Sequence, residues 1–128
     1  MQRTNYSSGA PLEERAGYSR MVKVDPFIFV GGTTAVQADG SVYGENDPYL
    51  QAKYIFEKLI GLLETAGSKK EDVIRIKAYT TDMKYAGEIG KAYTELFSSV
   101  RPLFTMLGIS MLNRASQLVE IELDAIIL

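Results

Sequence analysis

The chain has 128 residues, of which 46% are hydrophobic and 23% charged, enough to build one buried core. Its 14 Lys and Arg against 16 Asp and Glu give a net charge of -2. Nucleic acid is therefore not expected as a partner, because no basic excess is available for a phosphate backbone. Cysteine and histidine are absent, which excludes disulfides, thiolate nucleophiles, Cys/His zinc sites and imidazole triads. We expect no metal and no cofactor, and any catalysis must use carboxylates, tyrosines, lysines, arginines or hydroxyls.

The apolar runs of the chain, such as residues 27–30, are far too short to span a bilayer. No apolar stretch follows the first residues, so we expect a soluble, cytoplasmic protein that does not enter a membrane. No repeat, charge block or Pro/Gly-rich linker divides the sequence. Residues 1–128 are therefore predicted to form a single domain.

The first part of the chain predicts a loop followed by a β-hairpin. Residues 7–17 are rich in small and turn-forming types, which indicates a loop of the kind that often carries function. Residues 18–24 and 27–34 are rich in β-forming side chains. Since Asp25-Pro26 favours a turn between them, the two runs are predicted to pair.

From Asp47 the period of the apolar residues changes from two to about 3.6, which predicts a helix. Asp47 can cap its amino end, Pro48 fits its first turn, and Gly67 can end it in a left-handed conformation. Residues 68–71 have the spacing of a capping box and predict one more helical turn. Residues 72–81 then alternate, which predicts a half-buried strand. One face of this strand is predicted to contain Ile74, Ile76, Ala78 and Thr80.

A second helix is predicted after Asp82, because apolar residues recur at helical spacing up to Leu96. Residues 103–111 and 118–128 are predicted to be the last two strands. The expected order is hairpin, helix, strand, helix, hairpin. Because crossovers between parallel strands are right-handed, both helices should cover the same face of a mixed sheet.

The other face of this sheet is expected to stay uncovered. In residues 103–109 we expect Leu103, Thr105, Leu107 and Ile109 to face the helices, which leaves Phe104 and Met106 on the uncovered face. In the last strand, alternation places Glu120, Glu122 and Asp124 on that face as well. So much uncovered apolar surface predicts a homo-oligomer with clefts where subunits meet.

An ordered set of segments points to a known family: Gly17-Tyr18, residues 29–33, residues 66–76 and residues 118–126. Together they resemble the reactive intermediate deaminase family, also called Rid or YjgF. The resemblance implies an α+β protein with a chorismate-mutase-like mixed β-sheet and two helices on one face. It also implies a homotrimer with small-molecule sites between subunits, in agreement with the uncovered face.

Active members of this family hydrolyse enamines and imines to 2-keto acids and ammonia. The resemblance implies that Glu122, on the last strand, corresponds to the glutamate that positions the attacking water. The family's substrate-binding arginine comes two residues after a proline, and counting from Pro102 places Phe104 there. An apolar ring cannot form the bidentate pair that holds a carboxylate. Gly90 likewise stands where some active members have an asparagine.

The predicted site contains one catalytic residue, Glu122, together with seven ligand-binding residues. These are Tyr18, Arg20, Gly31, Gly32, Thr33, Phe104 and Met106. Tyr18 could bind a ligand through its hydroxyl, and Arg20 could supply the missing cation. The glycines and Thr33 could offer backbone amides to an anion. Phe104 would make the pocket more apolar than in the deaminases.

Each of these assignments has a structural alternative. Tyr18 could be ordinary aromatic packing, Arg20 a surface or interface residue, and the two glycines a strand exit. Glu122 lies between two other carboxylates on one face, and such neighbours raise at least one pKa and could create a general acid or base. The alternative for Glu122 is a solvated acidic stripe, or pairing with Arg75 and Lys77.

Two functions follow from the sequence. The first is a trimeric protein that binds a small metabolite in intersubunit clefts without the standard 2-imine deaminase activity. The alternative is an enamine or imine deaminase that uses Glu122, with Arg20 or Arg101 as the carboxylate-binding residue. A regulatory partner that acts through its outer surface is a third possibility, for which the sequence offers no exposed motif. A ribonuclease role is disfavoured, because no imidazole pair and no basic groove is present.

Overall fold

The computed structural model describes residues 2–128 and contains one six-stranded mixed sheet of order β1-β2-β3-β6-β4-β5. The helices are α1 (Pro11–Ala16), α2 (Pro48–Thr65) and α3 (Ala86–Phe97), with 3-10 turns η1 (Lys70–Asp72) and η2 (Met83–Tyr85). The strands are β1 (Thr4–Tyr6), β2 (Met21–Val24), β3 (Phe27–Thr33), β4 (Val73–Thr80), β5 (Leu103–Gly108) and β6 (Val119–Ile126). The predicted α+β class and mixed sheet are confirmed.

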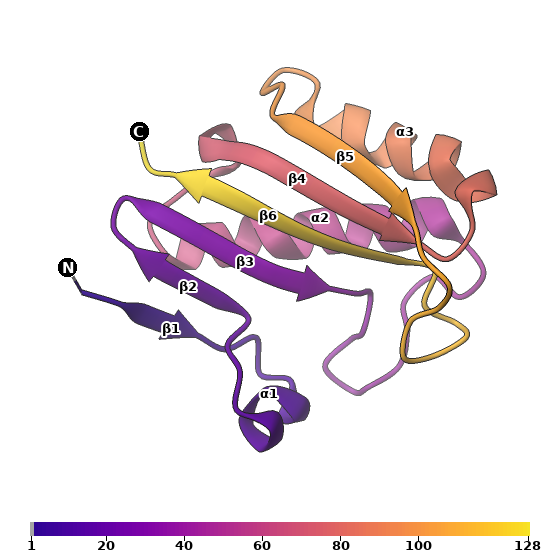
Figure 1. Cartoon of the computed structure of the whole chain (residues 1–128), viewed down its shortest axis with the longest axis horizontal. Helices are drawn as coiled ribbons and strands as arrows, with labels where there is room; N and C mark the ends of the chain where they lie inside the picture. Colours follow the sequence, from indigo (N-terminus) through magenta and orange to yellow (C-terminus); the bar gives the residue numbers. More distant parts are fainter. Residues whose placement is uncertain (1) are drawn as a thin grey trace.

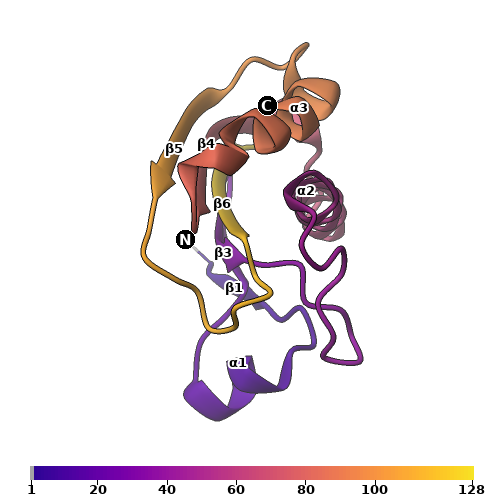
Figure 2. The same ribbon diagram turned by 90° about the vertical axis from the view of Figure 1, so that its right-hand side faces the viewer.

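Helices α2 and α3 lie on the same side of the sheet, as predicted (Figure 1, Figure 2). The core fills the space between them and the sheet. From α2 it takes residues at helical spacing, and from β6 every second residue, as the two periods require. The fully or almost fully buried ones are Ile55, Phe56, Leu59, Leu63, Val119, Ile121, Leu123 and Ala125.

The ends of α2 follow the predicted signals. The Asp47 side chain accepts a hydrogen bond from the Leu50 amide at 3.0 Å, and Gly67 beyond the carboxyl end adopts φ 83°. The predicted further turn is η1, where the Asp72 carboxylate accepts from the Ser68 hydroxyl at 2.8 Å. Neither α2 nor any other helix in residues 2–128 is both long and apolar enough to cross a membrane.

The prediction that residues 7–17 form a loop throughout is wrong, because α1 lies inside them. Pro11 occupies the first turn, where a missing amide hydrogen does no harm, and Glu13 and Glu14 favour the positive end of the helix dipole. Gly17 ends the helix at φ 81°. These signals act over only six residues, too short for the apolar periodicity on which helix prediction depends.

The predicted terminal hairpin is also wrong. Strand β5 pairs in parallel with β4, whereas β6 inserts between β3 and β4 and is antiparallel to both. Strands β3 and β4 are therefore parallel across β6, and the expected crossovers through α2 and α3 hold (Figure 1). The link of residues 109–118 is long enough to carry the chain from the sheet edge to its centre. In that position β6 forms hydrogen bonds along both of its edges.

The predicted orientation of β5 is reversed. Phe104 and Met106 pack on the core, while Leu103 and Leu107 on the opposite face are 57% and 51% exposed. Alternation did not decide between the two faces because both sets of side chains are mainly apolar. The register with β4, which pairs Ile76 with Phe104, fixes the choice. In β4, a bulge between Val73 and Arg75 likewise exposes Ile74, although alternation places it on the same face as the buried Ile76.

The opposite face of the sheet is uncovered within one chain, as predicted. In Figure 1 the strands lie in front of the helices, so this face points toward the reader. It carries exposed apolar side chains at both sides of the sheet and charged ones along β4 and β6. The exposed apolar residues include Phe27, Phe29, Leu103 and Leu107.

Candidate ligand-binding cleft

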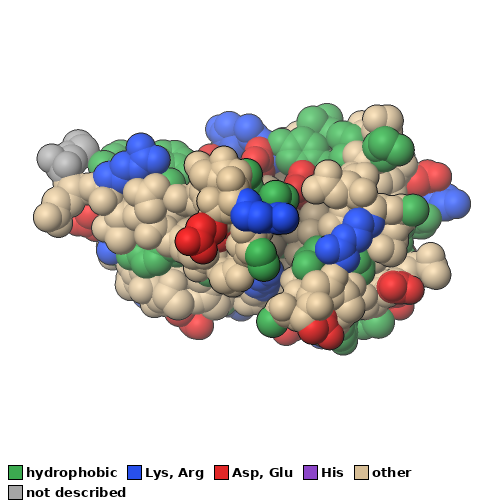
Figure 3. All heavy atoms as spheres, turned by 90° about the horizontal axis from the view of Figure 1, so that it is seen from below, with side chains coloured by type: hydrophobic (Ala, Val, Ile, Leu, Met, Phe, Trp, Pro, Cys, Tyr) green, Lys and Arg blue, Asp and Glu red, His purple; other side chains and the backbone are tan. Residues whose placement is uncertain are grey.

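A cleft of about 1000 Å³ lies at the end of the sheet where α1 meets the loops that follow β3 and β5. Figure 3 views the molecule from this end and shows Lys and Arg side chains around a hollow. Residues from the amino-terminal loop, the start of β2, the end of β3, α2 and β6 line it. The polar and charged lining residues include Tyr18, Arg20, Thr33, Lys58 and Glu120, and Gly32 contributes backbone.

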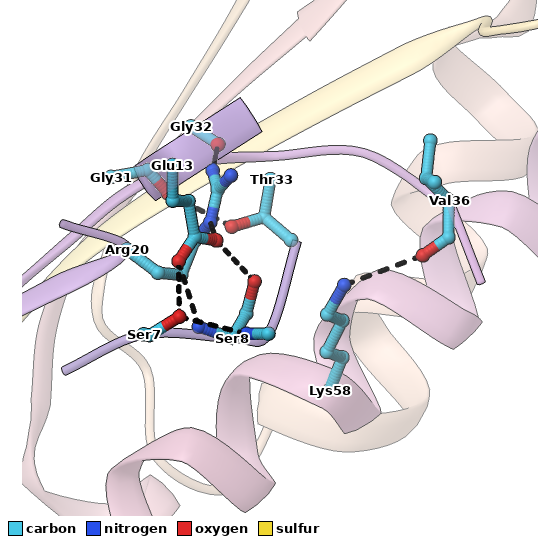
Figure 4. Close-up of polar contacts among 10 residues, drawn as sticks. Ser7, Ser8, Glu13, Arg20, Gly31, Gly32, Thr33, Val36 and Lys58 are labelled. Carbon is cyan, nitrogen blue, oxygen red and sulfur yellow. Dashed lines mark hydrogen bonds and ion pairs between the residues drawn. The ribbon is translucent and has the colours of Figure 1, made fainter. Parts of the chain in front are cut away.

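A buried ion pair contributes its arginine, Arg20, to one wall of this cleft. Glu13 of α1 is only 3% exposed, and its carboxylate accepts from Arg20 Nε at 3.1 Å. The Ser7 hydroxyl and the Ser8 amide donate to the same carboxylate at 2.8 and 2.9 Å, and the Ser8 hydroxyl donates as well (Figure 4). A buried charge needs such partners, and here every one comes from residues 7–20.

The environment of Glu13 favours its ionised form. Burial by itself acts to raise the pKa of this carboxyl. The hydrogen bonds from Ser8, from Ser7 and from Arg20 outweigh burial, and the pKa of Glu13 is lowered. Glu13 therefore remains a fixed anion that holds Arg20 in place.

Arg20 connects this ion pair to the end of β3. Its Nη1 donates to the Gly32 carbonyl, and its guanidinium carbon lies 5.5 Å from the Tyr18 ring centroid. The pairing of β3 with β6 is irregular between Val30 and Thr33, which marks a bulge at Gly31 and Gly32. The Gly31 amide donates to the Arg20 carbonyl at 2.8 Å, so the bulge is fixed from both directions.

The absence of a side chain at Gly32 allows the Glu120 carboxyl to lie against the backbone. A Cβ at Gly32 would lie 2.8 Å from Glu120 Cδ, closer than real contacts allow. Burial raises the pKa of Glu120, the charge of Glu122 adds to the rise, and Arg20 opposes it. A carboxyl that retains its proton more readily than usual can act as a general acid or base.

The opposite wall of the cleft contributes Lys58, from α2. Its side chain is half-buried, and Nζ lies 3.4 Å from the Val36 carbonyl oxygen (Figure 4). Burial lowers the pKa of Lys58 and the charge of Arg20 lowers it further, whereas Glu13 acts in the opposite direction. Among residues 2–128, no three His, Cys, Asp or Glu side chains lie close enough together to hold a metal ion.

The structure brings together one part of the predicted site. Tyr18, Arg20, Gly32 and Thr33 all line the cleft, and Gly31 lies in the bulge beside them. Thr33 is 2% exposed and its hydroxyl donates to the Gly31 carbonyl at 2.9 Å. These residues therefore form one connected structure at the ends of β2 and β3.

The other predicted residues lie elsewhere in the chain. Glu122 lies on the uncovered sheet face, opposite Lys77 in register, and accepts from the Tyr79 hydroxyl at 2.8 Å. That hydrogen bond, together with burial, raises the pKa of Tyr79. Phe104 and Met106 lie on the helix side of the sheet, and the Phe104 ring centroid is 4.2 Å from that of Tyr93. Within one chain they do not share the cleft with Tyr18.

Sequence reasoning missed Glu13 and Lys58, and considered Glu120 only as a neighbour of Glu122. Pro11 could have indicated the start of a helix. In the first turn of that helix, the Glu13 side chain can accept hydrogen bonds from the preceding Ser7 and Ser8. Lys58 is one turn from Tyr54 along α2, so helical spacing predicts that both lie on the same face of the helix. It does not predict that the loop containing Val36 covers Lys58. Glu120 and Glu122 lie on the same face of β6, and Glu120 differs because the bulge in β3 places Gly32 against its carboxyl.

This geometry defines a class: a small α+β protein with two helices on one sheet face, an uncovered second face and a polar cleft at the sheet end. The chain matches the family Endoribonuclease L-PSP over residues 8–127, and it belongs to that family, the YjgF or Rid family. This confirms the family resemblance and the chorismate-mutase-like fold.

Several individual proteins agree. The chain is 36% identical to the uncharacterized protein SCO2049 of Streptomyces coelicolor over 118 residues, 92% of this chain and 87% of that protein. It is 31% identical to a RutC family protein of Aquifex aeolicus, over 85% of this chain and 87% of that one. Among solved structures, Rv2704 of Mycobacterium tuberculosis superposes with a TM-score of 0.88 at 32% identity, covering 98% of this chain and all of that one. Yeast Mmf1, at 21% identity, has a TM-score of 0.87 over 99% of this chain and 100% of its own, which shows the fold alone.

Proposed function

We propose that this protein binds a small metabolite in clefts between the subunits of a homotrimer and lacks the standard 2-imine deaminase activity. The observation that carries the proposal is the position of Phe104. Aligned from Pro102, it stands where the family's substrate-binding arginine belongs. An aromatic ring there offers no donor to a substrate carboxylate.

The surroundings of Phe104 support this proposal. Its ring lies 4.2 Å from Tyr93, which is itself stacked on Phe97 at 5.9 Å between centroids. We call Tyr93, Phe97 and Phe104 the aromatic layer. Its rings contact each other instead of leaving space for a polar substrate group. The position is therefore used for packing between β5 and α3.

The assembly is supported by the uncovered face of the sheet. Phe29 and Leu103 are 50% and 57% exposed on that face, and burial against further copies of the chain would remove both from water. Sedimentation should report a trimer for the wild type. Glu122→Ala should also remain a trimer if Glu122 serves a ligand. Collapse of that variant to monomers would show that Glu122 is structural, and a monomeric wild type would contradict the proposed assembly.

The second candidate function is an enamine or imine deaminase with a substitute arginine. Arg20 is already paired with Glu13, so a substrate carboxylate would have to displace an internal one. Arg101 is the better substitute, because it has no ion-pair partner within 4 Å among residues 2–128, and its charge acts against burial to lower the pKa of Tyr93 in the aromatic layer. It precedes β5 with φ 58°, outside the regular strand.

Turnover of 2-aminoacrylate and 2-iminopropionate by pure protein separates the two functions. We expect no turnover by the wild type and a gain in Phe104→Arg, with Phe104→Leu as the control that changes packing without adding charge. Turnover by the wild type that disappears in Arg101→Met would establish the deaminase instead. No gain in Phe104→Arg would mean that other parts of the site have also diverged.

We do not propose a nuclease activity for this chain, although the family is named after an endoribonuclease. The sequence has no histidine and a net charge of -2, so an imidazole acid-base pair is excluded and strong attraction to a phosphate backbone is not expected.

A further inference from the structure

The charges in the cleft are unequally compensated. Arg20 is paired with Glu13 at 3.1 Å and also donates to the Gly32 carbonyl. In the described residues, 2–128, no carboxylate lies within 4 Å of Lys58 Nζ, whose hydrogen-bond partner is the Val36 carbonyl at 3.4 Å. A half-buried ammonium with one long hydrogen bond has donors left for another group.

The remaining cations of the cleft are less suited to fix a ligand. Arg15 and Arg114 are exposed, so water and salt screen them, and Arg114 also donates to the Gly40 carbonyl. An anion that approached Arg20 would lie beside Glu13, which contacts Arg20 at 3.1 Å but lies more than 4 Å from Lys58 Nζ, so the repulsion is stronger at Arg20. Of the cations in the cleft, Lys58 is thus the one that should stabilise a ligand's negative charge most.

We propose that Lys58 is the residue of this protein that binds the acidic group of its ligand, and that this group is a carboxylate. The inference rests on the proposed function, because it names the chemical class of the metabolite to be bound and places its acidic group in the cleft described above. It replaces Arg20 in the role that the sequence suggested for it and makes Arg20 a positioning residue for the bulge at Gly32.

The cleft favours a carboxylate over a phosphate. Phosphates are commonly bound by several backbone amides at once, but the Gly31 amide already donates to the Arg20 carbonyl at 2.8 Å. Glu120 shares the cleft, and its charge repels a dianion more than a monoanion. One ammonium on a flexible stem suits a single negative charge.

The test is calorimetric titration with three probes: 2-oxobutyrate, inorganic phosphate and uncharged butanamide. We expect 2-oxobutyrate to bind the wild type and Lys58→Arg, and to bind Lys58→Met about tenfold or more weakly, because a hydrogen bond to a charged group is lost. Lys91→Met is the matched control, since Lys91 is an exposed lysine of α3 and its removal changes the net charge equally. It should bind like the wild type.

A second measurement locates the contact. After reductive methylation with carbon-13, which keeps the positive charge, the signal absent from Lys58→Met identifies Lys58. 2-Oxobutyrate should shift that signal, whereas butanamide should not.

The outcomes separate this inference from the proposed function. Equal affinity of Lys58→Met and the wild type, with an unmoved Lys58 signal, would overturn the role of Lys58 and leave metabolite binding standing. Tighter binding of phosphate than of 2-oxobutyrate, lost in Lys58→Met, would overturn the carboxylate assignment. Binding of butanamide as tight as that of 2-oxobutyrate would show that the cleft does not select an anion. No binding of any probe to the wild type at millimolar concentration would overturn both proposals.

Discussion

The cleft and the aromatic layer lie at two parts of one sheet and handle burial in opposite ways. In the cleft, Glu13 and Arg20 are buried as charges and are satisfied by each other and by Ser7 and Ser8. In the aromatic layer, the half-buried Phe104 and Tyr93 are shielded from water through ring contacts. In this chain, therefore, the groups able to recognise an anion lie around α1, β3 and α2, and not on β5.

The largest effect is expected from breaking the buried ion pair. Glu13→Gln leaves the Arg20 guanidinium, whose side chain is 13% exposed, without its counter-charge. We expect a loss of about 3 kcal/mol in the free energy of unfolding, since removal of one partner leaves a buried charge unpaired. Urea denaturation measures the loss.

The control for that change is a double-mutant cycle. Arg20→Met should be similarly destabilising, and the double variant should lose much less than the sum of the two. Additive losses would mean that the two side chains do not act as a pair.

The same carboxylate predicts a direction of pH dependence. Because the pKa of Glu13 is lowered from an ordinary 4.5, its contribution to stability is complete above about pH 4.5 and is lost as the pH falls through the folded-state pKa. The stability difference between the wild type and Glu13→Gln should therefore shrink in acid. A difference that stays constant down to pH 2, measured by denaturant titration, would contradict an ionised Glu13.

The aromatic layer should give the next largest effect. Phe104→Ala should lower the free energy of unfolding by roughly 2 kcal/mol, less than for a fully buried ring because Phe104 is half-buried. Leu103→Ala is the matched control on the same strand, and in the isolated subunit its 57% exposed side chain should matter little. If subunits cover that face, the loss for Leu103→Ala should grow with protein concentration, which would sharpen the comparison.

A smaller effect is expected at the bulge. Gly32→Ala places a methyl group 2.8 Å from Glu120 Cδ, so the carboxyl must swing toward water. We expect a loss of about 1 kcal/mol and a fall in the pKa of Glu120, since burial is the main cause of its rise. NMR titration of the Glu120 carboxyl measures this. Gly90→Ala, where no atom lies within 4 Å of the added group, should instead stabilise α3. An unchanged pKa of Glu120 in Gly32→Ala would contradict the prediction that the glycine keeps the Glu120 carboxyl buried.

The smallest effect concerns Glu120 itself and has the opposite sign to that of Glu13. Because the folded-state pKa of Glu120 is raised, its ionised form lowers stability above that pKa, and the penalty disappears as the pH falls below an ordinary 4.5. Glu120→Gln should therefore be slightly more stable than the wild type at pH 7, by about 0.5 kcal/mol or less, and equal to it in acid. Lower stability at pH 7 would show that the Glu120 charge is favourably held.

Elements whose signals are local could be predicted from the order of the amino acids. Asp47, Pro48 and Gly67 bound α2 because caps act within one turn, and Asp25-Pro26 marked the first hairpin. The alternation of β6 separated Ile121 and Leu123 from Glu120 and Glu122, because burial of one face requires a period of two. The family resemblance also followed from the sequence, while the single domain, the homotrimer and the cytoplasmic location stay predictions.

Features that depend on contacts between distant segments could be recognised in the folded chain but not in its sequence. Phe104 and Leu103 are both apolar, so the face that each takes was decided by the register of β5 on β4. The insertion of β6 between β3 and β4 cannot be recognised in a chain order that suits a hairpin equally well. Glu13, Lys58 and Glu120 are more than 40 residues apart in sequence. Lys58 and Glu120 line one cleft, and Glu13 is bound to its lining residue Arg20, because a bulge, a short helix and a loop meet at the same end of the sheet. No local pattern encodes such a meeting.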